Sequence, residues 1–547
     1  MLNDGSALDD VLSFHFEVQP ATARELGRRE FDGRFPEVDR PSVAALAALR
    51  ERLTPGLSAP SPAARADVRT GLAWLDREAF RVEVLGRRHR DPVECLSETD
   101  VWGYVKQPYA ETGEKVAAVE AHLSGVPDFL RRAEDAVGAT LPAGERLHAL
   151  ELSRALAADL RDTAGLLAVE HPGLRAPHLE PLAEAAAVAC ERFAERVGGS
   201  APEAGVLGPE LLREWVRVSE GVDQSVADLV GEAQAEVDAL VAALDELVVR
   251  FGVARRRDLY DVMERPEPGQ DAADCIAPIV DRLRRFWTDR DVVGVETLNP
   301  LVLRPRPRMF AAAEFGIVGP IEGVHPHHLY LPQKAAQGRH FALPMLEMLA
   351  VHETYAGHYA HTEAVFRHTR GVRNSMRLWA GFIEGWAHYA EELAIEQGLA
   401  DGRPLVRAAQ LLAALEAATR LLIHMSVHSR RWSFGEAVQQ AVRLCDWPVP
   451  QATREVLAAT FDWRVSLYTF GKLRIREWRR DFAADATPER LRAFHDGLLQ
   501  GGFAPLEVVR QFAAESEKLR TENKPDEEVP DPDVRDAKQW ATDGERA

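Results

Sequence analysis

Three histidines and two glutamates stand close together in the stretch LAVHETYAGHYAHTEA (349–364), where the surrounding residues predict a buried helix. The pair His352-Glu353 opens like the pattern H-E-x-x-H, in which two imidazoles hold a zinc ion and the glutamate acts as a base. The next histidine, however, is His358, six positions after the first. On a straight helix, side chains six positions apart point about 120° away from each other. The two imidazoles can therefore share one ion only if a bulge or kink interrupts the helix, and Gly357 stands where that would have to occur.

A second apolar helix is predicted for LWAGFIEGWAHYAEELAIEQG (378–398), and it carries Glu384, His388 and Glu391 on one face. Glu384 stands among tryptophan and phenylalanine residues, where a carboxylate takes up a proton unless a positive charge keeps it ionised. Zinc hydrolases commonly take a third ligand from a second helix and leave a fourth position for water. Glu384 fits that position. The simpler interpretation is that Glu384 pairs with an arginine and that each histidine is a hydrogen-bonded core residue without any metal.

The segments HETYAGH (352–358) and EGWAHYAE (384–391) resemble the two motifs of the bacterial domain-of-unknown-function family DUF885. The similarity extends from PATARELGRREFDGRFP near the start to about residue 510. That family is distantly similar to the gluzincin zinc metallopeptidases, such as the thimet oligopeptidase, angiotensin-converting enzyme and carboxypeptidase Taq groups. The resemblance implies a mainly α-helical, gluzincin-like fold with a deep channel between two halves.

The resemblance also implies a role for each residue of the two motifs. One Zn²⁺ ion would be held by His352, His358 and Glu384. Glu353 would be the general base, which deprotonates a water that the metal has made more acidic.

The chain departs from the family pattern near this site. Ala356 replaces the family's proline, which leaves the shape of the bulge open, and His361 replaces the usual glutamine. His424 replaces a common aspartate further along. Whether His361 or His388 joins the metal ligands also stays open.

Two later segments resemble family elements: RLLIHMSVHSRRWSFGEA contains His428, and SLYTFGKLRIREWR contains Tyr468 and Lys472. Amide hydrolysis needs a donor to the developing oxyanion, and Tyr468 and His428 are the candidates. A core tyrosine and a surface histidine are equally compatible with the sequence. Lys472 is a candidate substrate-binding residue. Tyr330 is another, because gluzincins pair an edge strand with the extended substrate and Tyr330 lies in a strand-like segment.

Most of the chain has helical periodicity, with clear examples at 41–53, 143–171 and 225–252. The exception is 297–333, where prolines, glycines and short β-prone runs predict a small β-sheet before the metal-site helix. We therefore expect an N-terminal helical half (1–296), a catalytic half (297–520) and a disordered acidic tail (521–547).

Composition narrows the partners of the protein. A net charge of −20 over 547 residues argues against nucleic acid and against an anionic membrane surface. The four cysteines are isolated, the first residues MLNDGSALDD resemble no secretion signal, and no run of 18 apolar residues is present. These features favour a cytoplasmic protein; the oligomeric state stays open.

The sequence thus favours a zinc-dependent hydrolase, a metallopeptidase that cleaves short peptides. One alternative is a metal-dependent enzyme that acts on a non-peptide small molecule. The other is a non-catalytic helical binding protein in which the same residues form a dry polar network.

Overall fold

In a computed structural model, residues 4–37, 42–86, 91–109, 111–137, 140–171, 173–196, 198–199, 205–267, 270–306, 314–316, 325–332, 341–482 and 487–522 are described. The fold is mainly α, as predicted. The first 296 residues contain α1 (Asp4–Val18), α2 (Pro20–Glu25), α3 (Val43–Leu53), α4 (Pro62–Glu83), α5 (Pro92–Ser97), α6 (Trp102–Lys106), α7 (Thr112–Ala136), α8 (Ala143–Arg161), α9 (Thr163–Glu170), α10 (Glu180–Arg196), α11 (Pro209–Glu220), α12 (Val226–Phe251) and α13 (Ala272–Arg290).

The remaining helices follow the small sheet and include the two that carry the histidine and glutamate motifs. They are α14 (Leu343–Glu353), α15 (His358–His368), α16 (Val372–Ser375), α17 (Ala380–Glu396), α18 (Pro404–His428), α19 (Phe434–Cys445), α20 (Val449–Ala459), α21 (Arg464–Phe482), α22 (Pro488–Leu499) and α23 (Leu506–Glu522). The short 3₁₀ helices are η1 (Arg29–Phe31), η2 (Thr54–Ser58), η3 (Pro177–Leu179) and η5 (Arg256–Val262). Among the described residues, no helix is long and apolar enough to cross a membrane.

Local signals explain where the long helices begin and end. The Ser225 side chain accepts a hydrogen bond from the Asp228 backbone N–H at the start of α12, and Gly252 ends that helix with a φ of 63°. The stretch 143–171 is divided at Asp162 into α8 and α9.

The predicted sheet is present between the two sets of helices. Its strands are β3 (Leu301–Arg306), β4 (Glu314–Gly316) and β5 (His327–Pro332), in the order β3-β5-β4. β3 and β5 are parallel, whereas β4 and β5 are antiparallel. A second, two-stranded parallel sheet joins β1 (Thr140–Leu141) to β2 (Gly198–Gly199).

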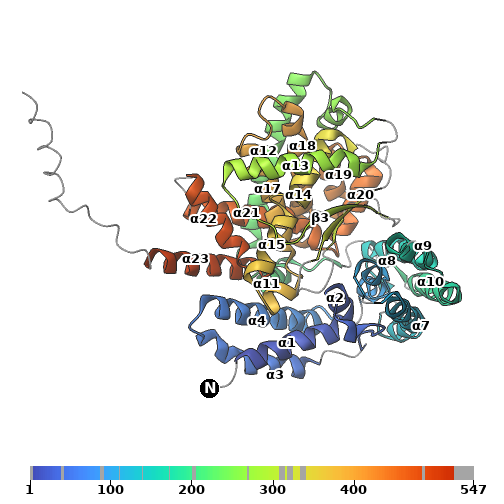
Figure 1. The fold of residues 1–547 in the computed structure, drawn as a ribbon. Helices are drawn as coiled ribbons and strands as arrows, with labels where there is room; N and C mark the ends of the chain where they lie inside the picture. Colours follow the sequence, from blue (N-terminus) through green and yellow to red (C-terminus); the bar gives the residue numbers. More distant parts are fainter. Residues whose placement is uncertain are drawn as a thin grey trace, which may run out of the picture.

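Helices α14, α15 and α17 occupy the middle of the molecule (Figure 1), with α1, α3 and α4 below them and α7 to α10 at one side. The largest hydrophobic core draws on residues from both predicted halves, from Leu212 and Trp287 to Trp386 and Phe512. The predicted boundary between two halves at residue 296 is therefore not visible in the packing of this core, and it stays a prediction. Residues 523–547 of the predicted tail lie outside the described residues.

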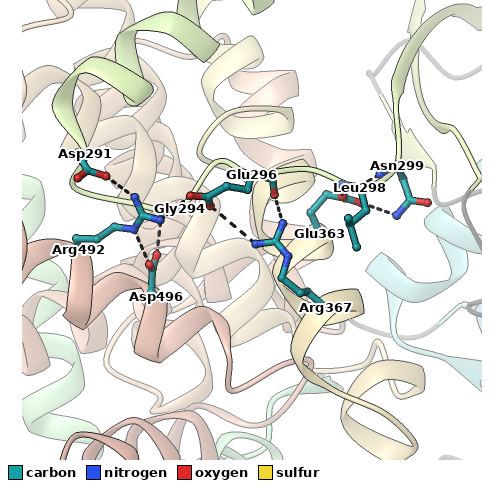
Figure 2. Close-up of polar contacts among 9 residues, drawn as sticks. All are labelled: Asp291, Gly294, Glu296, Leu298, Asn299, Glu363, Arg367, Arg492 and Asp496. Atoms are coloured by element: carbon teal, nitrogen blue, oxygen red, sulfur yellow. Dashed lines mark hydrogen bonds and ion pairs between the residues drawn. The ribbon is translucent and has the colours of Figure 1, made fainter. Parts of the chain in front are cut away.

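A polar network fixes α15 against the segment that leads into the sheet (Figure 2). The carboxylate of Glu363 accepts hydrogen bonds from the Asn299 backbone N–H at 3.0 Å and from its side-chain amide at 2.7 Å. His327 on β5 contacts the same carboxylate at 3.0 Å. From α22, Arg492 binds Glu296 at 2.8 Å. Since Glu363 follows His358 on the same helix, this network also holds one candidate metal ligand in place.

Candidate metal centre

The helix that carries the first motif is broken, and the break is sharper than the predicted bulge. Helix α14 ends at Glu353 and α15 begins at His358, with four non-helical residues between them. The predicted interruption of the helix near Gly357 is present, as a four-residue turn between two separate helices. The break reorients the chain, so His352 and His358 face each other with ring centroids 4.7 Å apart and ring planes at 89°.

The residues of the turn explain this geometry. A methyl group at Gly357 would lie 1.8 Å from the carbonyl oxygen of His352, so only glycine fits there. The buried indoles of Trp287 and Trp386 donate hydrogen bonds to the carbonyl oxygens of Tyr355 and Ala356, at 2.9 and 2.8 Å. The turn is therefore buried with these two carbonyl groups satisfied.

A second glycine contact brings α17 and α21 together. A methyl group at Gly471 would lie 1.8 Å from the Gly381 carbonyl oxygen, and one at Gly385 would lie 2.5 Å from the Cα of Gly471. The two helix backbones touch at this point. Their contact places Tyr468 of α21 beside Glu384 of α17.

Three side chains converge from α14, α15 and α17. One carboxylate oxygen of Glu384, Oε2, lies 3.5 Å from Nε2 of His352 and 3.4 Å from Nε2 of His358. The three ligand atoms lie within 4.8 Å of one another. This Oε2 is buried and has no hydrogen bond among the described residues.

These distances fit a metal ion. Two ligand atoms at 2.0–2.1 Å from a tetrahedral zinc ion are about 3.4 Å apart. A direct hydrogen bond between imidazolium and carboxylate would be shorter, about 2.7–2.9 Å. The donor set is also one that zinc prefers.

Glu391 orients the first histidine. Nδ1 of His352 donates a hydrogen bond to Oε1 of Glu391 at 2.7 Å, which turns Nε2 toward Glu384. Burial would raise the pKa of Glu391, but the neighbouring His388 and the hydrogen bond from His352 lower it to about 2. Burial opposes protonation of His352, yet the nearby carboxylates of Glu384 and Glu391 raise the pKa of that imidazole well above its usual value. The site thus concentrates negative charge that protonated imidazoles or a metal ion can balance.

Tyr468 and Glu353 complete the cluster. The Tyr468 ring stacks on His352 with centroids 5.9 Å apart, and its hydroxyl bonds to Glu384. Burial, followed by the charges of Glu384 and Glu353, raises the pKa of Tyr468 well above 10, so its O–H remains available as a donor. Glu353 is buried at the end of α14, directly after the first histidine.

His361 and His388, the two further histidines considered as metal ligands, are not part of this cluster. Among the described residues, only His352, His358 and Glu384 form a group that could hold a metal. His361 packs edge-on against Phe382, and burial lowers its pKa to about 3. Nδ1 of His388 lies 3.4 Å from Glu391.

The structure does not bring the two candidate substrate-binding residues to a free surface of the site. The Lys472 side chain is fully buried and pairs with Glu236 and Glu392, at 2.7 and 3.2 Å. Tyr330 is fully buried in the core, and its hydroxyl bonds to Nδ1 of His328 at 2.8 Å. Their proposed roles stay predictions that this packing does not favour.

A cavity of about 780 Å³ opens beside Glu384, between α2, α4 and α5 of the N-terminal part and α17, α18 and α21. His428 lines it but is occupied: Nδ1 accepts from the Leu207 backbone N–H at 3.2 Å, and Nε2 donates to the Ala459 carbonyl oxygen at 2.8 Å. As an oxyanion donor His428 is therefore less suited than Tyr468. His424 lines the cavity too, with both ring nitrogens buried and without a hydrogen bond among the described residues.

Together these features define a mainly helical protein with a His-His-Glu cluster, one member of which, Glu384, lines a cavity. Residues 20–512 match the family described as bacterial protein of unknown function (DUF885), and the chain belongs to that family.

Solved structures align with this chain at low sequence identity, and the first two below share its fold. A "putative lipoprotein of unknown function" from Shewanella oneidensis aligns with a TM-score of 0.73 at 16% identity, over 94% of this chain and 100% of that one. A "putative lipoprotein" from Colwellia psychrerythraea aligns with a TM-score of 0.66 at 12% identity, over 94% and 99%. Metallocarboxypeptidase 1 of Trypanosoma cruzi aligns with a TM-score of only 0.36 at 11% identity, over 94% and 99%. No curated protein matches the chain. These names lend no support to a cytoplasmic location, which stays a prediction.

Sequence reasoning missed one residue with a clear part in the site. Glu391 was placed on the same helix face as Glu384, but its bond to His352 was not foreseen. The i, i+7 spacing was the available signal, since it directs both carboxylates toward the same neighbouring helix.

Proposed function

We propose that this protein is a zinc-dependent hydrolase that cleaves short peptides. The observation that carries the proposal is the buried Oε2 of Glu384, which lies between the imidazoles of His352 and His358 and has no hydrogen bond within the part of the chain that the structure describes. Burying such an oxygen unsatisfied is unfavourable, and a divalent cation would compensate it.

Three side chains near the metal ligands have separate roles in the proposed reaction. A zinc ion, when bound, would polarise a carbonyl and make a water more acidic. Glu353 accepts the proton of the attacking water, and Tyr468 donates its O–H to the oxygen that becomes negative. Glu391 fixes the orientation of His352. The partial burial of these groups strengthens each electrostatic contact.

The cavity supports a small substrate. Its volume of about 780 Å³ lies in the range that holds small ligands, roughly 300–1,000 Å³. A short peptide fits such a space better than a folded protein does. The mixture of apolar and charged lining residues agrees with a peptide.

Metal analysis and a peptide screen test the proposal. We expect one zinc per purified chain, lost in His352→Ala and retained in Glu353→Gln. Peptide cleavage should fall at least about 100-fold in Glu353→Gln, because general-base catalysis contributes that much or more. His178→Ala is the control, since His178 is a half-exposed histidine on η3.

Two results would contradict the proposal. Absence of metal in the wild type, with variants that lose only stability, would point to a non-catalytic binding protein. Bound zinc without cleavage of any peptide would point to a non-peptide substrate.

A further inference from the structure

Two arginines beside the candidate metal centre differ from the other arginines of the cavity. Arg77 on α4 and Arg377, just before α17, both line the cavity that Glu384 also lines. Nε and Nη2 of Arg377 are buried and have no hydrogen bond among the described residues. Nη1 of Arg77 donates to the Leu378 carbonyl oxygen at 3.3 Å, but its Nε is likewise buried without a partner there. Since Leu378 follows Arg377 directly, the two guanidinium groups come from adjacent parts of the wall.

The remaining arginines of the cavity have carboxylate partners. Arg24 pairs with Glu98 at 3.3 Å, Arg464 pairs with Asp462 at 2.9 Å, and Arg81 pairs with Glu94. Arg77 and Arg377, by contrast, form no ion pair with a carboxylate among the described residues.

The nearby carboxylates do not neutralise these two arginines. Glu220 attracts Arg77, but its Oε1 accepts from the Gly381 backbone N–H, and burial raises its pKa to about 7. Glu25 attracts Arg377, but it is 49% exposed and pairs with Lys106 at 3.4 Å. Burial lowers the pKa of both Arg77 and Arg377 to about 10, which reflects the cost of holding their charges away from water.

We propose that Arg77 and Arg377 form an anion subsite that binds a carboxylate of the substrate. The inference rests on the proposed function, because it names the substrate class of that site: short peptides with a carboxylate near the cleaved bond. Guanidinium groups suit this task because their planar donors match the two oxygens of a carboxylate.

The position of the subsite limits where that carboxylate stands in the peptide. Arg377 precedes Glu384 by seven residues, and α17 begins at Ala380. Three extended and four helical steps separate their Cα atoms by no more than about 17 Å. An extended peptide advances about 3.3–3.6 Å per residue, so a separation of this size corresponds to about five residues between the carboxylate and the cleaved bond. An acidic side chain and a free C-terminus both meet this condition.

A set of four pentapeptides separates these two sources. The peptides share one sequence and differ in a single Glu or Gln residue and in a free or amidated C-terminus. Binding is measured by calorimetry on the full-length, zinc-loaded Glu353→Gln protein, so that no turnover is needed. Arg377→Met and Arg77→Met are compared with Arg377→Lys and with the control Arg250→Met, an exposed residue near the end of α12.

We expect Arg377→Met and Arg77→Met to weaken binding of the carboxylate peptides about ten- to hundredfold and to leave the neutral peptide unchanged. Arg377→Lys should keep part of the affinity, because lysine has the positive charge but lacks the planar pair of donors of a guanidinium group. Arg377→Met should not lower the melting temperature, because it removes a charged group whose buried Nε and Nη2 have no hydrogen bond among the described residues.

Other outcomes would overturn the subsite. Equal losses for neutral and charged peptides, or a lower melting temperature with no effect on binding, would give the arginines a structural role. Glutarate tests the site without any peptide: it should raise the melting temperature of the wild type but not of Arg377→Met. Absence of that difference contradicts the subsite, whereas absence of zinc or of hydrolysis contradicts only the proposed function.

Discussion

Helices α17 and α21 carry two buried polar clusters that are built in opposite ways. In the first, Lys472 pairs with Glu236 and Glu392, and Arg476 contacts the same two carboxylates at 2.9 and 3.5 Å. In the second, the candidate metal centre, Glu384 and Glu391 each keep a buried oxygen without a hydrogen bond among the described residues. The first cluster is neutralised by the chain itself, whereas the second depends on imidazoles or on an added cation.

The neighbouring residues Glu391 and Glu392 make the difference plain. Glu391 is 5% exposed and bonds to His352, whereas Glu392 faces Lys472 and Arg476. Successive residues on a helix point about 100° apart, so two adjacent glutamates belong to different clusters. A buried carboxylate therefore indicates a metal site only where no lysine or arginine of the chain pairs with it.

The largest expected effect comes from removing the cation of the first cluster. Lys472→Met leaves Glu236 and Glu392 with Arg476 alone, so we expect the free energy of unfolding to fall by about 3–5 kcal/mol. Glu384→Gln in the metal-free protein should cost less, because this carboxylate is balanced by the imidazoles of His352 and His358, at 3.5 and 3.4 Å, and not by a permanently charged lysine or arginine. Urea denaturation of both metal-free variants measures the difference. Equal losses in the two variants would remove the distinction between the clusters.

The sequence predicted the elements of the metal site well and its surroundings poorly. Spacing and apolar neighbours, which are local features of two helices, pointed to the two motifs, and the resemblance to DUF885 implied the ligand set His352, His358 and Glu384. An interruption of the helix near Gly357 was also predicted, but its shape was not, because the turn depends on the distant indole of Trp287 and on a backbone contact of Gly357.

Lys472 and Tyr330 show the same limit. Lys472 pairs with a glutamate 236 positions earlier in the sequence, and one sequence gives no signal for such a contact. Tyr330 lies in a predicted strand, but only the tertiary packing against Trp102 shows that the ring faces the core.

A third buried carboxylate tests whether burial of the charge has a measurable cost. Burial raises the pKa of Glu220 from 4.5 to about 7, because the charge of Arg77 and the hydrogen bonds from Gly381 and Leu506 offset only part of the effect of burial. Because the folded state holds this proton more tightly than the unfolded state, the stabilisation is complete below pH 4.5 and is lost as the pH rises to about 7. The loss amounts to at most about 3 kcal/mol.

Comparison with Glu220→Gln isolates this contribution. The variant should show a flatter dependence of the free energy of unfolding on pH between 4.5 and 7, measured by urea denaturation. If the free energy of unfolding of the wild type changed with pH over this interval in the same way as that of Glu220→Gln, Glu220 would already be ionised in the folded protein.

The smallest effect is the most direct test of the comparison, because it uses the same substitution at two adjacent positions. Glu391→Gln keeps an oxygen that can accept from Nδ1 of His352 but removes the charge that makes this imidazole a better ligand. We expect zinc affinity to fall about ten- to hundredfold, as for other residues that support a metal ligand, in competition with a chelator at fixed pH. Glu392→Gln should leave zinc affinity unchanged and lower only the stability, since its partners are Lys472 and Arg476. If Glu392→Gln weakened zinc as much as Glu391→Gln does, the two clusters would act as one, and the added cation would not be specific to the second.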